Sequence, residues 1–349
     1  MTNISQLDLL RKFNEKEANY NSEMTKIYGH RYTEYKEKYN LLYEFKQEPD
    51  FPPYIMIEQT YKCNLSCPIC IHGYDKIKKQ FDVNENGSVM PFETYKKIID
   101  EGEKFNCPSV SMMVNDEPLL VKDLEKRVKY AKDHGFMDVI MVSNGNLLTE
   151  KRMKSVVESG VTRLLFSIDA ASDETYKQVR PGKGSFSKVV ENLTRLHKYK
   201  EENNLKIPYT RASMVINKEN QHEILKFLNF WSDKVDGIEF QTFSYYYNEN
   251  RNLIPDIKEA SKVEDFSCSE PWHKVIIRQN GDVLPCCTFY GYDIPLGNIH
   301  KNSIHEIFNS KGFKDIREDV KNKDYRINAC ETCANSLYKI DVDKLISIN

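Results

Sequence analysis

Three cysteines that lie within eight residues constrain the fold of this chain more than any other feature. Cys63, Cys67 and Cys70 follow directly after an apolar run at residues 54–59, and gaps of three and two residues separate them. Gaps of this size let one loop place three thiolates around a single inorganic core. A four-iron cube needs four ligands and the loop offers three, so one iron would stay open to another ligand.

A zinc knuckle is the alternative use of the same loop. Three thiolates and a borrowed fourth ligand, for example His72, would complete the coordination of one zinc ion. The position of the loop, directly after the first strand of an alternating series of strands and helices, argues against zinc.

The first residues and the distribution of apolar residues predict that the cysteines of this chain are in a reducing compartment. The first residues, MTNISQLDLLRKF, lack the basic start and apolar run of a signal peptide, and no apolar stretch approaches the ~20 residues that span a bilayer. We therefore expect a cytoplasmic protein without membrane contact, in which nine cysteines indicate metal binding rather than disulfides. The net charge of −2 provides no basic field for nucleic acid.

The middle of the chain, residues 51–248, alternates between strand patterns and helix patterns. Six strand-like runs lie at residues 54–59, 109–114, 138–143, 163–168, 208–216 and 237–243. Helical patterns lie between them, at residues 92–105, 121–134, 150–159, 186–203 and 219–232. Repeated β-then-α units predict an α/β fold with a parallel sheet and with functional groups at the carboxyl ends of the strands. Six strands do not close an eight-stranded barrel, so we expect a partial (βα)6 barrel.

The two flanking regions show different patterns. Residues 1–50 form an N-terminal extension that we expect to be one helix over 8–48, with a stripe of tyrosines at Tyr28, Tyr32, Tyr35, Tyr39 and Tyr43. Packing of this stripe on the barrel is the favoured interpretation, and a lid over substrate is the alternative. Residues 249–349 predict a small second domain that starts with a hairpin, with strands at 272–279 and 282–286 around Asn280-Gly281. Short helices follow near 304–309 and 313–321 and from 330.

The C-x3-C-x2-C loop after the first strand resembles the signature of the radical S-adenosylmethionine (SAM) superfamily. The resemblance implies that SAM binds the open iron of a [4Fe–4S] cluster. An electron from a flavodoxin- or ferredoxin-type donor would then split SAM into methionine and a 5′-deoxyadenosyl radical. The family usually has an aromatic residue before the third cysteine, where this chain has Ile69, which can still pack against adenine.

Further matches to this family lie where the predicted strands end. Asn115-Asp116-Glu117-Pro118 resembles the Gly-Gly-Glu-Pro motif that holds the SAM ammonium group; both glycines are replaced, but the carboxylate is kept. Ser143-Asn144-Gly145 resembles the ribose-binding turn. Ser167 begins a segment like S-[IL]-D, and Arg180 is implied to bind the SAM carboxylate. The predicted SAM contacts are Ile69, Asn115, Asp116, Glu117, Ser143, Asn144, Ser167 and Arg180.

Four more cysteines form a second set in the C-terminal region. Cys268 and Cys286 are separated by seventeen residues, and Cys330 and Cys333 follow after a gap. The pattern resembles the twitch domain, a short form of the SPASM domain, found in 2-deoxy-scyllo-inosamine dehydrogenases and related sugar and aminocyclitol dehydrogenases and epimerases. The resemblance implies one auxiliary [4Fe–4S] cluster held by Cys268, Cys286, Cys330 and Cys333. A structural zinc site is the alternative for these four thiols.

The reaction implied by these resemblances is the removal of a hydrogen atom from a polar, carbohydrate-like small molecule. Oxidation of an alcohol and epimerisation both remain open; in an epimerase a thiol returns the hydrogen atom, and Cys287, directly after Cys286, is the candidate donor. A maturase of a ribosomally made peptide and a non-catalytic zinc-binding protein are the rival functions. Further candidates for substrate contact are Glu58, His72, Arg211, Glu239, Gln241 and Tyr245.

Overall fold

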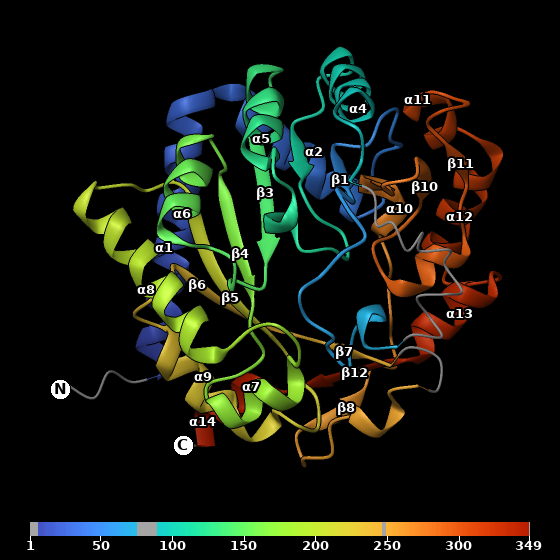
Figure 1. The fold of residues 1–349 in the computed structure, drawn as a ribbon. Coiled ribbons are helices and arrows are strands. Elements are labelled where there is room, and N and C mark those ends of the chain that lie inside the picture. Colours follow the sequence, from blue (N-terminus) through green and yellow to red (C-terminus); the bar gives the residue numbers. More distant parts are fainter. Residues whose placement is uncertain (1–5, 75–88, 246–248, 349) are drawn as a thin grey trace.

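The six predicted barrel strands form a parallel series in chain order. A computed structural model describes residues 6–74, 89–245 and 249–348. The strands are β1 (Tyr54–Ile57), β2 (Ser109–Ser111), β3 (Asp138–Ser143), β4 (Arg163–Ser167), β5 (Tyr209–Val215) and β6 (Gly237–Gln241). Neighbouring strands pair in parallel from β1 to β6, so the predicted partial (βα)6 barrel of an α/β fold is confirmed (Figure 1).

Helices cover the outer face of the barrel sheet and bury its apolar side chains. They are α4 (Phe92–Lys104), α5 (Leu124–Asp133), α6 (Glu150–Glu158), α7 (Asp173–Val179), α8 (Phe186–Glu202) and α9 (Ile224–Trp231). Hydroxyl side chains of Thr149, Ser172 and Ser185 accept hydrogen bonds from the first turns of α6, α7 and α8 and so fix where these helices begin. Helix α7 was not predicted, although Ser172 followed by Asp173 and Glu174 is a helix-start pattern.

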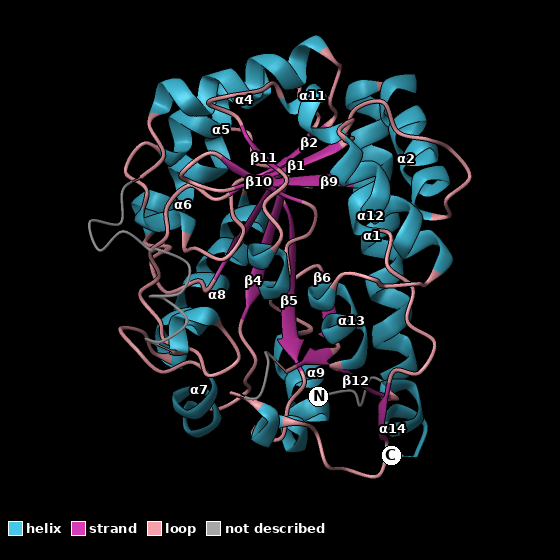
Figure 2. Ribbon diagram, turned by 90° about the vertical axis from the view of Figure 1, so that its right-hand side faces the viewer, coloured by secondary structure: helices cyan, strands magenta, loops and turns pink. Residues whose placement is uncertain are grey.

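The N-terminal extension forms two helices, so the prediction of a single helix over 8–48 was wrong. Helix α1 (Gln6–Tyr28) and helix α2 (His30–Tyr43) are separated by Gly29, whose φ of 59° is a left-handed conformation that favours glycine. In both views the two helices lie on the opposite side of the sheet from α4, α5, α6 and α8 (Figures 1 and 2).

The tyrosines of this extension pack at the amino ends of the barrel strands. Tyr20, Tyr32 and Tyr35 are buried together with Met137 and Tyr209, and Tyr209 is the first residue of β5. Packing is therefore confirmed for Tyr32 and Tyr35, and Tyr28 and Tyr39 are partly buried against the same cluster, whereas Tyr43 is exposed. A lid would have to lie at the carboxyl ends of the strands, where functional groups gather.

The C-terminal region extends the barrel sheet. Strand β9 (Lys274–Ile277) pairs in parallel with β1, and the hairpin of β9 with β10 (Asp282–Leu284) turns at Asn280-Gly281, as predicted. Strand β11 (Gly297–Asn298) completes a nine-stranded order, β11-β10-β9-β1-β2-β3-β4-β5-β6. The hairpin is thus held by backbone hydrogen bonds to the first barrel strand.

The remaining helices and strands lie between residues 243 and 348. The helices are α10 (Glu270–His273), α11 (Ile304–Phe308), α12 (Lys311–Asn322), α13 (Asn328–Asn335) and α14 (Val342–Ile348). A second sheet has the order β7-β12-β8, formed by β7 (Phe243–Ser244), β8 (Ala260–Lys262) and β12 (Leu337–Ile340). Single 3-10 turns occur at Ile71–Gly73, Pro118–Leu120, Gln221–Glu223, Arg251–Leu253 and Phe289–Asp293. No helix among the described residues is both long and apolar enough to cross a membrane.

Candidate active site

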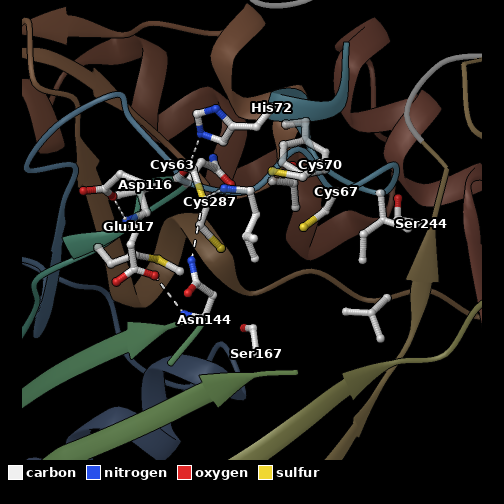
Figure 3. A pocket seen from close by; sticks show the side chains of 18 of the residues that line it. Cys63, Cys67, Cys70, His72, Asp116, Glu117, Asn144, Ser167, Ser244 and Cys287 are labelled. Atoms are coloured by element: carbon white, nitrogen blue, oxygen red, sulfur yellow. Dashed lines mark hydrogen bonds between the residues drawn. The ribbon is translucent and has the colours of Figure 1, made fainter. Parts of the chain in front are cut away.

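A cavity of about 340 Å³ lies at the carboxyl ends of the barrel strands. Ser143, Ser167 and Val215, the last residues of β3, β4 and β5, line it from the barrel. Cys287 lines it from the C-terminal region. Figure 3 shows the thiols of the first cysteine loop around this cavity, with strand-end side chains facing them. The barrel, the first loop and the C-terminal region therefore share one space.

The first cysteine loop is held against a neighbouring segment by its backbone. Cys63, Cys67 and Cys70 all line the cavity. Ser66 N donates to the Pro181 carbonyl oxygen over 2.7 Å, and a side chain at Gly182 would come within 2.7 Å of the Leu65 Cα atom. Only glycine permits this approach. Burial raises the pKa of Cys63 and Cys67 to about 12 and that of Cys70 to about 11.

The carboxylate of Glu117 is fixed by three donors at the edge of the cavity. Its Oε1 atom accepts from Leu119 N over 3.1 Å and from Ser143 Oγ over 2.8 Å, and its Oε2 atom accepts from Asn144 N over 2.8 Å. Burial raises the pKa of Glu117, and these hydrogen bonds oppose the rise. The arrangement presents a rigid acceptor for a cationic group.

Asn144 joins the third strand end to the first cysteine loop. Its Nδ2 atom donates to Asn64 Oδ1 over 2.8 Å and lies 3.9 Å from Cys63 Sγ, within reach of a weak hydrogen bond to sulfur. Its Oδ1 atom accepts from Asn146 N over 3.0 Å. The predicted ribose-binding turn is therefore rigid and lies directly beside a cysteine of the loop.

Arg180 and Ser167 line the cavity next to the fourth strand. The Arg180 guanidinium forms an ion pair with Asp169, with 2.6 Å between Nη2 and Oδ2, and Asp169 Oδ1 accepts from Val215 N over 2.8 Å. Burial alone would lower the pKa of Arg180, but the charge of Asp169 leaves that pKa raised. Arg180 is thus a largely buried cation at the cavity edge rather than a surface residue. Ile69 also lines the cavity and packs beside Phe243.

Asn115 and Asp116 line the cavity, but their polar groups are used within the protein. The Asp116 carboxylate accepts from three backbone amides, those of Val114, Gln59 and Thr60. The Asn115 Nδ2 atom donates to the Tyr292 hydroxyl over 3.0 Å. Both side chains therefore hold protein segments together, which differs from the direct SAM contact expected from the motif.

His72 lines the cavity without joining the cysteines. Its Nε2 atom is 2.7 Å from the Asn115 carbonyl oxygen, and its ring lies 5.3 Å from that of Tyr61. This nitrogen is thus engaged by the backbone, which does not support the zinc alternative in which His72 supplies a fourth ligand.

The second cysteine set encloses a separate, much smaller space. Cys268, Cys286, Cys330 and Cys333 all line a cavity of about 60 Å³ whose other walls include Ile294, Ile316 and Val320. Burial raises the pKa of each of these thiols. A side chain at Gly291 would come within 2.5 Å of the Cys286 carbonyl oxygen, so the chain folds back tightly over this ligand position.

Cys287 points to the large cavity although its neighbour Cys286 lines the small one. The Cys287 Sγ atom donates to Glu270 Oε2 over 3.5 Å, and Glu270 Oε1 lies 2.8 Å from Lys274 Nζ. Burial, and then the charge of Glu270, raise the pKa of Cys287 to about 12. Cys333 lines both cavities, so the second cysteine set borders on the large one.

Several residues proposed from the sequence as substrate contacts lie elsewhere. Glu58 is fully buried against Tyr292, Arg211 pairs with Glu239, and Gln241 donates to Glu239. None of these, nor Tyr245, is among the residues that line the large cavity. Several side chains that line the cavity carry no motif that could have identified them, namely Met113, Thr242, Phe243, Ser244, Thr288, Phe289, Tyr290 and Leu337.

The ninth cysteine, Cys107, is separate from both sets. Its Sγ atom donates to the Pro52 carbonyl oxygen over 3.3 Å, and the side chain is buried in the barrel core. All nine cysteines are free thiols in the structure.

The two cysteine sets differ in how they could serve as cluster ligands. Among the described residues, no three His, Cys, Asp or Glu side chains converge as the ligands of one metal ion would. The fit is instead one of donor type. Three thiols line the larger cavity, which leaves one iron of a four-iron cluster open to a further ligand, and four thiols line the smaller cavity, which supplies a ligand to every iron.

A partial barrel with three thiols at its open end, followed by a second four-thiol pocket, defines a class of barrel enzymes that bind iron–sulfur clusters. Residues 57–230 match the sequence model of the radical SAM superfamily, and residues 268–334 match that of SPASM, an iron–sulfur cluster-binding domain. The chain belongs to the radical SAM superfamily and is a radical SAM enzyme with a C-terminal SPASM domain. These domains imply SAM and two [4Fe–4S] clusters.

Relatives and solved structures extend this similarity. The tungsten-containing aldehyde ferredoxin oxidoreductase cofactor-modifying protein of Pyrococcus furiosus is 25% identical over 323 residues, which cover 80% of this chain and 87% of that protein. BtrN in complex with AdoMet and 2-DOIA has a TM-score of 0.55 at 18% identity, over 83% of this chain and 94% of BtrN. Streptococcus suis SuiB bound to S-adenosylmethionine has a TM-score of 0.61 at 16% identity, over 82% of this chain and 73% of SuiB. At these identities the structures show a common fold.

Proposed function

We propose that this protein is a radical SAM epimerase of a polar, carbohydrate-like small molecule, with Cys287 as the hydrogen-atom donor. The observation that carries the proposal is the position of Cys287. Its thiol lines the same cavity as Cys63, Cys67 and Cys70, and the preceding residue lines the pocket of the second set.

The cavity residues have complementary roles in this proposal. When bound, SAM and the clusters supply a 5′-deoxyadenosyl radical after one-electron reduction by a flavodoxin- or ferredoxin-type donor in the cytoplasm. Glu117 receives the SAM ammonium group, and Arg180 binds its carboxylate. Ser143, Asn144 and Ser167 orient the ribose, and Ile69 packs against adenine. Asn115 and Asp116 act indirectly, through the segments that they hold.

The proposed reaction leaves the substrate at its original oxidation level. The substrate C–H bond would break, and its hydrogen atom would bond to the 5′ carbon of the radical that bound SAM supplies. The S–H bond of Cys287 then breaks and its hydrogen atom forms a new C–H bond on the side where Cys287 lies. The thiyl radical on Cys287 returns to the thiol with one proton and a second electron from the same class of donor. Glu270, which accepts the Cys287 hydrogen bond, holds the sulfur in place.

The lining near Cys287 supports a neutral, hydroxylated substrate. Segments 242–244 and 287–290, with Cys333 and Leu337, contribute hydroxyl and aromatic side chains to the cavity and, among its described lining residues, no charged one. A charged substrate buried here would lack an opposite charge on these segments, which is costly.

Oxidation of the substrate is the second candidate. Cys333 lines both cavities, so a cluster in the small pocket would lie at the wall of the substrate space and could accept the second electron. In that reaction the product is a ketone and Cys287 transfers no hydrogen atom.

The test is turnover in deuterated water with SAM, dithionite and a panel of probes. The probes are 2-DOIA, neutral hexoses and cyclitols, and short peptides. The proposal predicts that a hydroxylated probe raises 5′-deoxyadenosine formation and gains one solvent deuteron at the altered carbon. Cys287→Ser should abolish deuteration, whereas Cys107→Ser, the matched change at a thiol outside the cavity, should not.

Two results would contradict this function. A ketone that is also made by Cys287→Ser would identify a dehydrogenase. Stimulation by peptides alone would identify a maturase, the reaction class suggested by the likeness to SuiB, whose structure has also been solved bound to its precursor peptide SuiA.

A further inference from the structure

The two residues that replace the glycines of the family motif both use their side chains. The Asp116 carboxylate ties the segment after β1 to the segment after β2 by accepting from the backbone amides of Gln59, Thr60 and Val114. Asn115 reaches the C-terminal region, where its Nδ2 atom donates to the Tyr292 hydroxyl over 3.0 Å. Glycine offers neither contact, so the departure from the motif adds two specific connections to this chain.

The Tyr292 hydroxyl is part of a buried hydrogen-bonded chain. It donates to Glu58 Oε2 over 2.6 Å, and Glu58 is fully buried, with Oε1 accepting from Gln279 N over 3.2 Å. The Arg278 guanidinium lies 4.5 Å from the centre of the Tyr292 ring. A buried hydroxyl and carboxylate of this kind are costly to leave without partners, so the tyrosine is strongly constrained.

This chain of contacts connects the two halves of the active site. Asn115 is two residues before Glu117, and its carbonyl oxygen also bonds to His72, two residues after Cys70. Tyr292 is five residues after Cys287 and lies within the short 3-10 turn Phe289–Asp293. The hydrogen bond from Asn115 to Tyr292 therefore connects residues 114–117, and through His72 the first cysteine loop, with residues 286–293, which include Cys287.

We propose that the hydrogen bond from Asn115 to Tyr292 is a positioning contact through which SAM binding at Glu117 orders the Cys287 segment. Residues 114–117 are already held by the hydrogen bonds of Asp116 and Glu117, ligand binding to Glu117 adds a further restraint, and the Asn115 amide transmits this added restraint to residues 286–293. Asn115 and Tyr292 thus place the hydrogen donor over the cavity when SAM is present. The inference deepens the proposed function, on which it rests for the role of Cys287.

The test is amide hydrogen–deuterium exchange of the anaerobic holoenzyme with oxidised clusters, with and without SAM. In the wild type, SAM should slow exchange in residues 286–293 about fivefold, the factor expected of one net hydrogen bond. Asn115→Ala and Tyr292→Phe should each lose this SAM-dependent difference, and the double variant should lose no more than either single variant. Tyr20→Phe is the matched control, because Tyr20 also donates to a buried carboxylate, that of Asp138, at the other end of the barrel.

The outcomes separate positioning from simple stability. A purely structural contact would speed exchange with and without SAM equally and leave the difference between them intact, which would overturn the proposal. A SAM effect that persists in Tyr292→Phe, or losses that add in the double variant, would overturn it as well. The iron content of each variant reports whether it folds. If Asn115→Ala fails to fold, Tyr292→Phe still tests the contact, because it removes only the hydroxyl group and keeps the packed ring. The experiment uses no substrate, so its result is independent of whether Cys287 donates a hydrogen atom.

Discussion

The two cysteine sets of this protein are built in opposite ways. The first set lies on one loop, at the wall of a cavity of about 340 Å³, among fixed polar groups such as Glu117, Asn144 and Arg180. The second set comes from three separate segments and surrounds about 60 Å³ with mainly apolar neighbours. We call the first set the open set, because three thiols leave one iron of a four-iron cluster free for a further ligand, and the second the enclosed set, because its four thiols supply a ligand to every iron.

Both sets nevertheless rely on a close backbone approach at a glycine. Gly182 packs against the backbone of the first cysteine loop at Leu65, and Gly291 packs against the backbone of Cys286. In each case a Cβ atom would meet backbone within 3 Å. The difference between the sets therefore lies in what surrounds the thiols and not in how tightly the chain folds around them.

The largest expected effect comes from removing the open set. Changing Cys63, Cys67 and Cys70 together to Ala should reduce iron from ~8 to ~4 per chain and abolish 5′-deoxyadenosine formation, because the second set remains intact in its own pocket. Iron analysis and chromatography of the nucleoside products measure both quantities. Retained deoxyadenosine formation in this variant would show that the open set is not where SAM is cleaved.

Removing one ligand of the enclosed set should have a different result. Cys333→Ser should also lower iron toward ~4 per chain, yet SAM cleavage without substrate should continue, because the cavity of the first loop keeps its own ligands. Cys333 is the informative position because it lines both cavities. Zinc in place of iron in the second pocket of anaerobically purified protein would contradict the interpretation of that pocket.

A smaller effect is expected from the polar surroundings of the open set. Glu117→Gln should weaken SAM binding about 10- to 100-fold without loss of iron, since a charge-assisted contact is replaced by a neutral one. The matched control is Glu223→Gln, a buried glutamate whose Oε2 atom accepts from Ala171 N over 2.7 Å. If equilibrium titrations gave the same SAM affinity for the wild type and Glu117→Gln, the Glu117 carboxylate would not contribute to SAM binding.

The smallest effect is expected at the amino ends of the strands. Tyr20→Phe removes a hydroxyl that donates to Asp138 Oδ1 over 3.2 Å, so it should lower the free energy of unfolding by about 1 kcal/mol. A thermal unfolding scan of the holoenzyme should show a shift of about 2 °C, and SAM cleavage should be unchanged. Altered cleavage would mean that the N-terminal helices act on the active site after all.

Much of the fold could be predicted from the sequence because its patterns are local. The apolar runs at 138–143 and 163–168 match β3 and β4 within one residue. The division of the cysteines into two sets follows from their spacing together with the resemblance to the radical SAM and twitch patterns, and the structure places each set at one cavity. The break at Gly29 was missed because a tyrosine stripe of helical period continues on both sides of it.

The substrate-facing residues could not be predicted in the same way. Arg211 and Val215 lie on the same strand, but only Val215, at its carboxyl end, lines the cavity. The alternation of apolar and polar residues along a strand shows on which face of the sheet a side chain lies. It does not show which end of the strand borders a ligand. Phe289 and Thr288 line the cavity because the C-terminal hairpin joins β1, a long-range pairing that no local pattern reveals.

Mössbauer spectroscopy of the iron-57 holoenzyme, with and without SAM, tests the difference between the open and the enclosed set most directly. With ~8 iron per chain in two clusters, SAM should alter the signal of one iron and leave the four irons of the enclosed cluster unchanged. The same SAM-dependent change should appear in Cys333→Ser and be absent from the variant with Cys63, Cys67 and Cys70 replaced by Ala. A SAM effect on the enclosed cluster, or none on either cluster, would contradict the account.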